Sequence, residues 1–118
     1  VCMVGTASTY TDIQGRVIEG ASIDIVARTK ALQVIHKAYA VTGGIATATA
    51  ALIPGTIVND VVSEAAKRTK IVRLGHPSGT FTFNIDIDSE SLCVTKAGVA
   101  RTARPIMDGI AYVKASKY

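Results

Sequence analysis

The chain has 118 residues, of which 48% are hydrophobic and 19% are charged. At this length roughly two thirds of the unfolded chain's surface can be buried on folding, and the charge content is too low for intrinsic disorder. The formal net charge is +4, but only 5% of the residues are aromatic and Trp is absent, which argues against single-stranded nucleic acid as a partner. The longest apolar stretch, residues 41–58, is interrupted by Gly and Pro, and its uninterrupted part is about half of the ~20 residues that a membrane span needs.

Two cysteines, Cys2 and Cys93, lie near opposite ends of the sequence without metal-ligand spacing. We expect them to stay reduced, as is usual in a cytoplasmic protein, and we expect Cys93 to be an inert core residue. No set of metal ligands can be assembled from the sequence, so no metal site is expected.

The first third of the chain predicts one strand and one helix. Residues 1–4 are an apolar run that indicates a buried strand, and residues 5–20 are rich in Thr, Ser and Gly and read as a loop. Ser22 then resembles a helix cap before apolar residues at helical spacing over residues 23–34. This helix either continues or gives way to a strand near Val34-Ile35, where β-branched residues favour the strand.

Two helices are expected next. Residues 45–53 are apolar or small on every side, which a surface helix cannot be, so we predict a buried helix capped by Thr42 and stopped by Pro54. Its small side chains allow close approach of other backbone. A short helix follows over residues 61–67.

The remaining chain predicts strands. A short strand over residues 71–74 is followed by strict alternation of apolar and polar residues over 80–88, and a turn is expected at residues 88–91. Two more strands, residues 92–102 and 106–113, would complete an antiparallel meander. The fold class is therefore α+β, with strands wrapped around an apolar helix, and no domain boundary is evident within the chain.

The first candidate site is Thr42-Gly43-Gly44, ahead of the buried helix. The first N–H groups of a helix have no internal partner, and the helix dipole adds partial positive charge there. Such an end can bind a carboxylate or a phosphate. The alternative is an ordinary cap with glycines that permit tight packing. A nucleotide is not expected, because the remaining P-loop glycine and Lys are absent.

The second candidate is the loop that contains His76, Pro77, Ser78 and Gly79. It combines an imidazole, a hydroxyl and freely oriented backbone amides, with a proline that stiffens the chain. These groups suit the orientation of an anion, although a plain connection between two strands is the alternative. Ser78 and His76 are not assigned as a catalytic pair, since their spacing says nothing of geometry and no orienting acid is identifiable.

Other polar residues have more ordinary interpretations. We expect His36 to be a satisfied, partly buried imidazole, and we expect Asp86 and Asp88 to lie on a solvated strand face. Two arginines, Arg101 and Arg104, could clamp a carboxylate. A basic cluster that could bind nucleic acid consists of Lys67, Arg68, Lys70 and Arg73.

Several strings resemble the PrpF-type 2-methylaconitate isomerase family, which also includes methylitaconate Δ-isomerase and 4-oxalomesaconate tautomerase. They are Thr42-Gly43-Gly44, Gly75-His76-Pro77-Ser78-Gly79-Thr80, Val94-Thr95-Lys96-Ala97, Arg101-Thr102-Ala103-Arg104 and Met107-Asp108-Gly109. The similarity extends over essentially the whole chain and corresponds to the C-terminal part of the family.

The resemblance implies a diaminopimelate-epimerase-like fold, in which two similar domains, each a sheet rolled around a central helix, enclose an active-site cleft. It implies a cofactor-independent proton shift on unsaturated di- and tricarboxylates such as 2-methylaconitate, of the kind used in propionate catabolism. Both candidate loops would then line the cleft and bind substrate carboxylates.

The resemblance further implies that the catalytic Lys and Cys lie in an N-terminal half that is absent here. Neither Cys2 nor Cys93 matches the active-site cysteine by motif, and Lys96 is a doubtful substitute. We therefore expect a single domain or fragment, residues 1–118, that supplies half of a cleft and is inactive alone. Its partners would be a polycarboxylate, the missing half and a second copy of itself. The alternative is a non-catalytic anion-binding or accessory module of the same fold.

Overall fold

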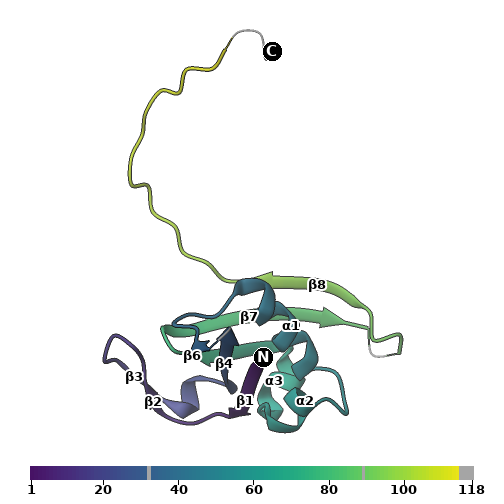
Figure 1. The fold of residues 1–118 in the computed structure, drawn as a ribbon. Helices are drawn as coiled ribbons and strands as arrows, with labels where there is room; N and C mark the ends of the chain where they lie inside the picture. The colour runs from purple at the N-terminus through teal and green to yellow at the C-terminus, as the bar shows by residue number, and fades with distance from the viewer. Residues whose placement is uncertain (32, 89, 115–118) are drawn as a thin grey trace.

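The computed structural model describes residues 1–31, 33–88 and 90–114 and has an α+β fold dominated by strands (Figure 1). The strands are β1 (Cys2–Thr6), β2 (Tyr10–Thr11), β3 (Val17–Ile18), β4 (Ile25–Ala31), β5 (Val34–Ile35), β6 (Ile71–His76), β7 (Gly79–Ile87) and β8 (Val94–Val99). The helices are a 3₁₀ turn, η1 (Gly20–Ser22), and α1 (Val41–Ala51), α2 (Ile57–Val61) and α3 (Glu64–Thr69).

The main sheet has the strand order β1-β4-β6-β7-β8, and β5 pairs separately with β4. The β6–β7–β8 part is an antiparallel meander, as predicted. By contrast, β4 and β6 are parallel neighbours, so the segment that holds α1, α2 and α3 is a crossover between them. This crossover places α1 against the sheet beside β7 (Figure 1).

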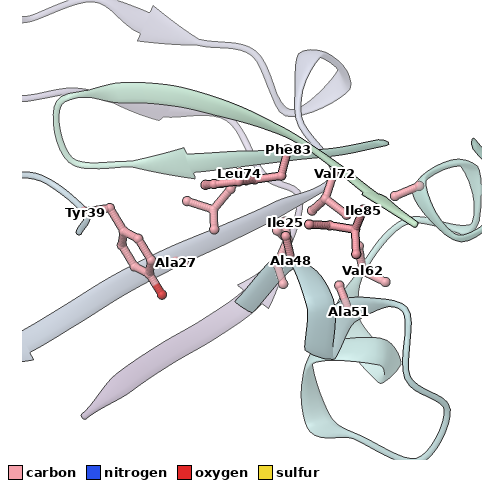
Figure 2. Packing of buried hydrophobic residues seen from close by; sticks show 11 residues of the cluster. Ile25, Ala27, Tyr39, Ala48, Ala51, Val62, Val72, Leu74, Phe83 and Ile85 are labelled. Carbon is pink, nitrogen blue, oxygen red and sulfur yellow. The ribbon is translucent and has the colours of Figure 1, made fainter. Parts of the chain in front are cut away.

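The core lies between the sheet and the helices (Figure 2). Its largest fully buried apolar side chains come from β4, β6 and β7 and are Ile25, Val72, Leu74, Phe83 and Ile85. Small residues face them from the helices, namely Ala48, Ala51 and Ala66. Because α1 presents alanines rather than large side chains, its backbone can approach the sheet closely.

The helix α1 confirms the prediction for residues 45–53 in type but differs in its start and in its burial. It begins at Val41 with Ala40 as its N-cap residue, so Thr42 lies inside the first turn and is not the cap. It ends before Pro54, as expected. Within the described residues only one face is buried, and Ala46 on the opposite face is exposed. The expected enclosure of this helix on every side is therefore not what the described chain shows.

The helix predicted over residues 23–34 is wrong, because this segment contains β4, an interior strand of the main sheet. Within β4, Ile25 and Ala27 are buried, at 0% and 1% exposed, while Val26 and Arg28 are partly exposed, which is the alternation of a strand. The helical spacing was incidental, and pairing with β1 and β6 decides the conformation. The alternative of a strand at Val34-Ile35 is correct, and Leu32, within the predicted helix, lies outside the described residues.

Three other predictions are corrected. The N-terminal strand forms, but β1 is a half-exposed edge strand and not a buried one. The helix predicted over residues 61–67 is divided into α2, capped by Thr56, and α3, capped by Ser63. No strand forms over residues 106–113, which are extended and exposed (Figure 1).

The expected turn at residues 88–91 includes Ser89, which lies outside the described residues. Asp88 accepts hydrogen bonds there from the backbone N–H groups of Glu90 and Ser91. Across residues 1–31, 33–88 and 90–114, no helix has the length and apolar character needed to cross a bilayer.

Candidate anion-binding site

The turn His76–Gly79 joins β6 to β7 and is held from outside by the segment that carries β2 and β3. The Tyr10 hydroxyl lies 2.9 Å from the carbonyl oxygen of His76 and 2.8 Å from that of Gly79, and can donate to either. Ile13 donates its backbone N–H to the Pro77 carbonyl at 2.7 Å. The turn is therefore a fixed part of the fold rather than a loose connection.

His76 is buried, with 5% of its surface exposed, and its ring stacks on Phe81 at a centroid distance of 4.6 Å. Burial lowers the pKa of His76, and the nearby Arg28 guanidinium lowers it further. The backbone N–H of Ser78 donates to Nδ1 of His76 at 3.3 Å. A neutral imidazole that accepts at Nδ1 carries its proton on Nε2, so His76 is a hydrogen-bond donor at Nε2 near neutral pH.

Ser78 also places its hydroxyl 3.3 Å from Nδ1 of His76. The two side chains are thus brought together, but none of the described acidic side chains hydrogen-bonds to His76. The geometry suits polar recognition of a ligand more than nucleophilic catalysis, which needs an oriented base.

The second candidate, the start of α1, has no side-chain cap. Ala40 at the N-cap supplies no side-chain hydrogen bond, and no acidic residue lies in the first turn. The N–H groups of Val41, Thr42 and Gly43 precede the first intrahelical bond, which Gly44 donates to Ala40 at 2.8 Å. Thr42 and Gly43 are exposed, whereas Gly44 is buried. This helix end can therefore receive a negatively charged group from solvent.

A row of aromatic contacts connects the two candidates on one face of the sheet. A Cβ atom on Gly44 would overlap the Phe83 ring, so the start of α1 lies directly on Phe83. Phe83 contacts Phe81 edge to face at 5.8 Å, and Phe81 in turn stacks on His76. The start of α1 therefore lies on the same face of the sheet as the His76 ring, but above Phe83, which pairs with Val72, whereas the turn closes at the His76–Gly79 pair.

A cavity of about 360 Å³ opens beside Phe81 and is lined by Thr80, Phe81, Ala100, Arg101 and Thr102. Arg101, one of the arginines considered from the sequence, is thus near the end of the sheet that carries the His76–Gly79 turn. Arg104 lies further along the exposed C-terminal segment and does not line this cavity.

Two residues of this region, Tyr10 and Arg28, were not found by sequence reasoning. Arg28 extends from β4, and its guanidinium lies 4.6 Å above the centre of the Tyr10 ring and donates to the Gly75 carbonyl at 3.2 Å. In a strand, the alternation that buries Ile25 and Ala27 puts Arg28 on the other face of the sheet. Predicting a strand instead of a helix for this segment would therefore have singled out Arg28.

The remaining candidates lie elsewhere. Lys96 pairs with Asp86 on the sheet face opposite Phe83 and lines a separate cavity with Asn84. Cys93 is exposed and precedes β8, so its expected place in the core is wrong. His36 accepts the backbone N–H of Ala38, as expected of a satisfied imidazole, but it is exposed and its expected partial burial is wrong.

Cys2 lies outside the site as well, although it contacts polar groups. Its sulfur contacts the Tyr39 hydroxyl, which lies 2.9 Å from the Thr47 hydroxyl, and Thr47 donates to the Gly43 carbonyl at 2.9 Å. Burial raises the pKa of Tyr39, and the Cys2 contact raises it further. This chain of hydrogen bonds links β1 to the first turns of α1 and has a structural role.

The sequence was compared with protein-family models and with known proteins, and both comparisons found matches. The family model described as PrpF protein matches residues 1–114. The chain is 40% identical to a 3-methylitaconate isomerase from Eubacterium barkeri, over 99% of this chain and 30% of the relative, and 35% identical to a 2-methyl-aconitate isomerase from Cupriavidus necator, over 92% and 28%.

A solved structure of methylitaconate-delta-isomerase superposes with a TM-score of 0.79 at 39% identity, covering 98% of this chain and 30% of that structure. The chain thus spans about 30% of the length of these relatives. Because the family model covers nearly the whole chain, the protein belongs to the PrpF family.

Proposed function

We propose that this chain supplies the carboxylate-binding half of the cleft of an isomerase that acts on unsaturated di- and tricarboxylates. The observation that carries the proposal is the uncapped start of α1, which lies on the same face of the sheet as the His76 ring and is connected to it through Phe83 and Phe81. The relatives named as 3-methylitaconate and 2-methyl-aconitate isomerases support this substrate class.

The reaction is a proton shift next to a C=C–carboxylate system. A base removes a proton, an allylic anion forms, and an acid returns the proton at another carbon or after rotation. During the shift, negative charge spreads onto a substrate carboxylate. Backbone N–H groups fixed before the reaction stabilise that charge at no cost of reorganisation. In this chain the amides of Thr42 and Gly43 and the Nε2 proton of His76 are the donors suited to this role.

The base and the acid, a Lys and a Cys, would come from the rest of a longer protein. In this proposal the chain is the C-terminal part of a two-domain, diaminopimelate-epimerase-like fold, and the missing half covers the exposed side of α1. The chemistry requires no metal or cofactor. The chain alone would therefore bind substrate weakly and would not catalyse, so turnover by the isolated chain would refute this part of the proposal.

The test is a titration of the isotope-labelled chain with trans-aconitate, followed by amide NMR. The expected result is saturable shifts at Thr42–Gly44 and His76–Gly79. Ser78→Ala should weaken binding, because the turn loses a hydroxyl donor, whereas Ser8→Ala, in an exposed loop, should not. Saturable shifts confined to other residues, or none at millimolar ligand, would contradict the proposal. If a longer protein that contains this chain, and is as long as its relatives, binds trans-aconitate but does not convert it, the accessory-module alternative is favoured.

A further inference from the structure

The segment from Tyr10 to Arg16 contacts the His76–Gly79 turn entirely through the carbonyl groups of the turn. The Tyr10 hydroxyl lies between the carbonyl oxygens of His76 and Gly79 and can donate to either, Ile13 donates to that of Pro77 at 2.7 Å, and Arg16 donates to that of Ser78 at 3.3 Å. All four carbonyl oxygens of the turn therefore face hydrogen-bond donors of this one segment. Because a carbonyl oxygen repels an anion, carbonyl oxygens that face this segment leave the opposite side of the turn more favourable for an anion.

The segment is itself rigid. Asp12 is buried, with 5% of its surface exposed, and accepts the backbone N–H groups of Gln14 at 2.8 Å and Arg16 at 2.9 Å. Its carboxylate also pairs with the Arg16 guanidinium at 2.7 Å. The Asp12 charge thus offsets that of Arg16, and the shape of the segment is fixed before any ligand arrives.

Because the charges of Asp12 and Arg16 offset each other, the positive charge near the turn comes from Arg28. Its guanidinium lies over the Tyr10 ring and bonds to the Gly75 carbonyl, one residue before the turn. Tyr10 also fills the space above Gly75, where a Cβ atom would come 3.0 Å from the Tyr10 ring and hydroxyl. Both the turn and Arg28 therefore contact Tyr10.

From this geometry we propose that Tyr10 and Arg28 are positioning residues, which hold the carbonyl groups of the His76–Gly79 turn away from the ligand and keep a cation next to the turn. The inference rests on the proposed role of the turn in carboxylate binding. It adds that recognition is controlled by two side chains on β2 and β4, far from the turn in sequence.

The first test uses Tyr10→Phe, which removes only the hydroxyl, and Tyr112→Phe as its control, since Tyr112 is 93% exposed. Without ligand, amide hydrogen exchange at Ser78 and Gly79 should become about two- to tenfold faster in Tyr10→Phe, the range expected for one lost hydrogen bond. Trans-aconitate should bind more weakly by a similar factor. Unchanged exchange at both amides would overturn the proposal.

The second test uses Arg28→Met and Arg28→Lys, with the His76 imidazole titrated by NMR in the ligand-free chain. The charged groups near this ring are Arg28 on β4 and the Asp12–Arg16 pair beside Ser78. Loss of the cation in Arg28→Met should raise the pKa of His76, and Arg28→Lys should keep it low. If both variants titrate alike, Arg28 acts only in packing and the proposal is wrong.

These readouts separate the two proposals. If the unaltered chain fails to bind trans-aconitate, the proposed function fails. If it binds, and neither exchange nor titration responds to the variants, only the positioning role fails.

Discussion

Gly43 and Gly44 are adjacent in α1 but have different physical roles. A Cβ on Gly43 would meet Tyr39 and Ala40 at 3.8 and 3.9 Å, which is ordinary contact, whereas one on Gly44 would overlap Phe83. Gly43→Ala should therefore stabilise the fold by about 0.5–1 kcal/mol, since Gly is costly within a helix. Gly44→Ala should destabilise it by about 1–3 kcal/mol through overpacking. Urea denaturation measures both, and a stable Gly44→Ala variant would contradict the close approach of α1 to β7.

His76 predicts a pH dependence of stability. Burial, and then the Arg28 charge, lower its pKa in the folded chain, so between that lowered pKa and about 6.5 the unfolded chain binds more protons. Stability should therefore fall as the pH is lowered from about 6.5 toward the folded pKa. Urea midpoints across this range check the slope. His76→Gln should reduce it, and His36→Gln, at an exposed histidine, should retain it.

At the scale of elements, one buried carboxylate connects β4, β6 and α3. Asp24 is 1% exposed, bonds the Arg73 guanidinium at 2.8 and 2.9 Å, and contacts the hydroxyl of Ser63, the α3 cap. Burial would raise the pKa of Asp24, but hydrogen bonds from Arg73 and Ser63 outweigh it, and the pKa is lowered.

Asp24→Asn should cost about 1–3 kcal/mol, the range for disrupting the hydrogen bonds of one buried polar group, because the Arg73 side chain is 41% exposed and stays solvated without its partner. The matched control is Asp108→Asn in the exposed C-terminal segment, which should leave the unfolding midpoint unchanged. Thermal and urea unfolding measure both variants. Equal stability of Asp24→Asn and the unaltered chain would mean that this network does not join the three elements.

Elements could be predicted where local pattern and tertiary contact agree. The alternation of Phe81, Phe83 and Ile85 identified β7, and the small residues before Pro54 identified α1. The β4 segment failed because residues 23–34 fit a helical period locally, and only the neighbouring strands select the extended form. The strand predicted over residues 106–113 is wrong for the opposite reason. Its side chains favour a strand, but no neighbouring strand pairs with it within the described chain.

At the scale of the whole molecule, both halves of the candidate site could be found from the sequence, but not their connection. Glycines and a His-Pro-Ser turn are local signals of anion binding. That they share one face of the sheet depends on Phe81 and Phe83, which the sequence identified only as strand residues. The roles of Tyr10 and Arg28 depend on contacts with the turn across more than 45 positions of sequence, which no local pattern contains.

The C-terminal segment leads to the last prediction. Beyond Ala100 the described chain is extended, and Ile106, Met107, Ile110 and Tyr112 are each more than 80% exposed. Apolar side chains gathered in this way mark an interaction surface. Deletion of residues 103–118 should therefore leave the unfolding free energy within about 0.5 kcal/mol of its original value and should reduce self-association in sedimentation velocity. A large loss of stability would show that the segment packs on the domain, and equal association of both forms would assign the contact to another surface, such as the open edge of β8.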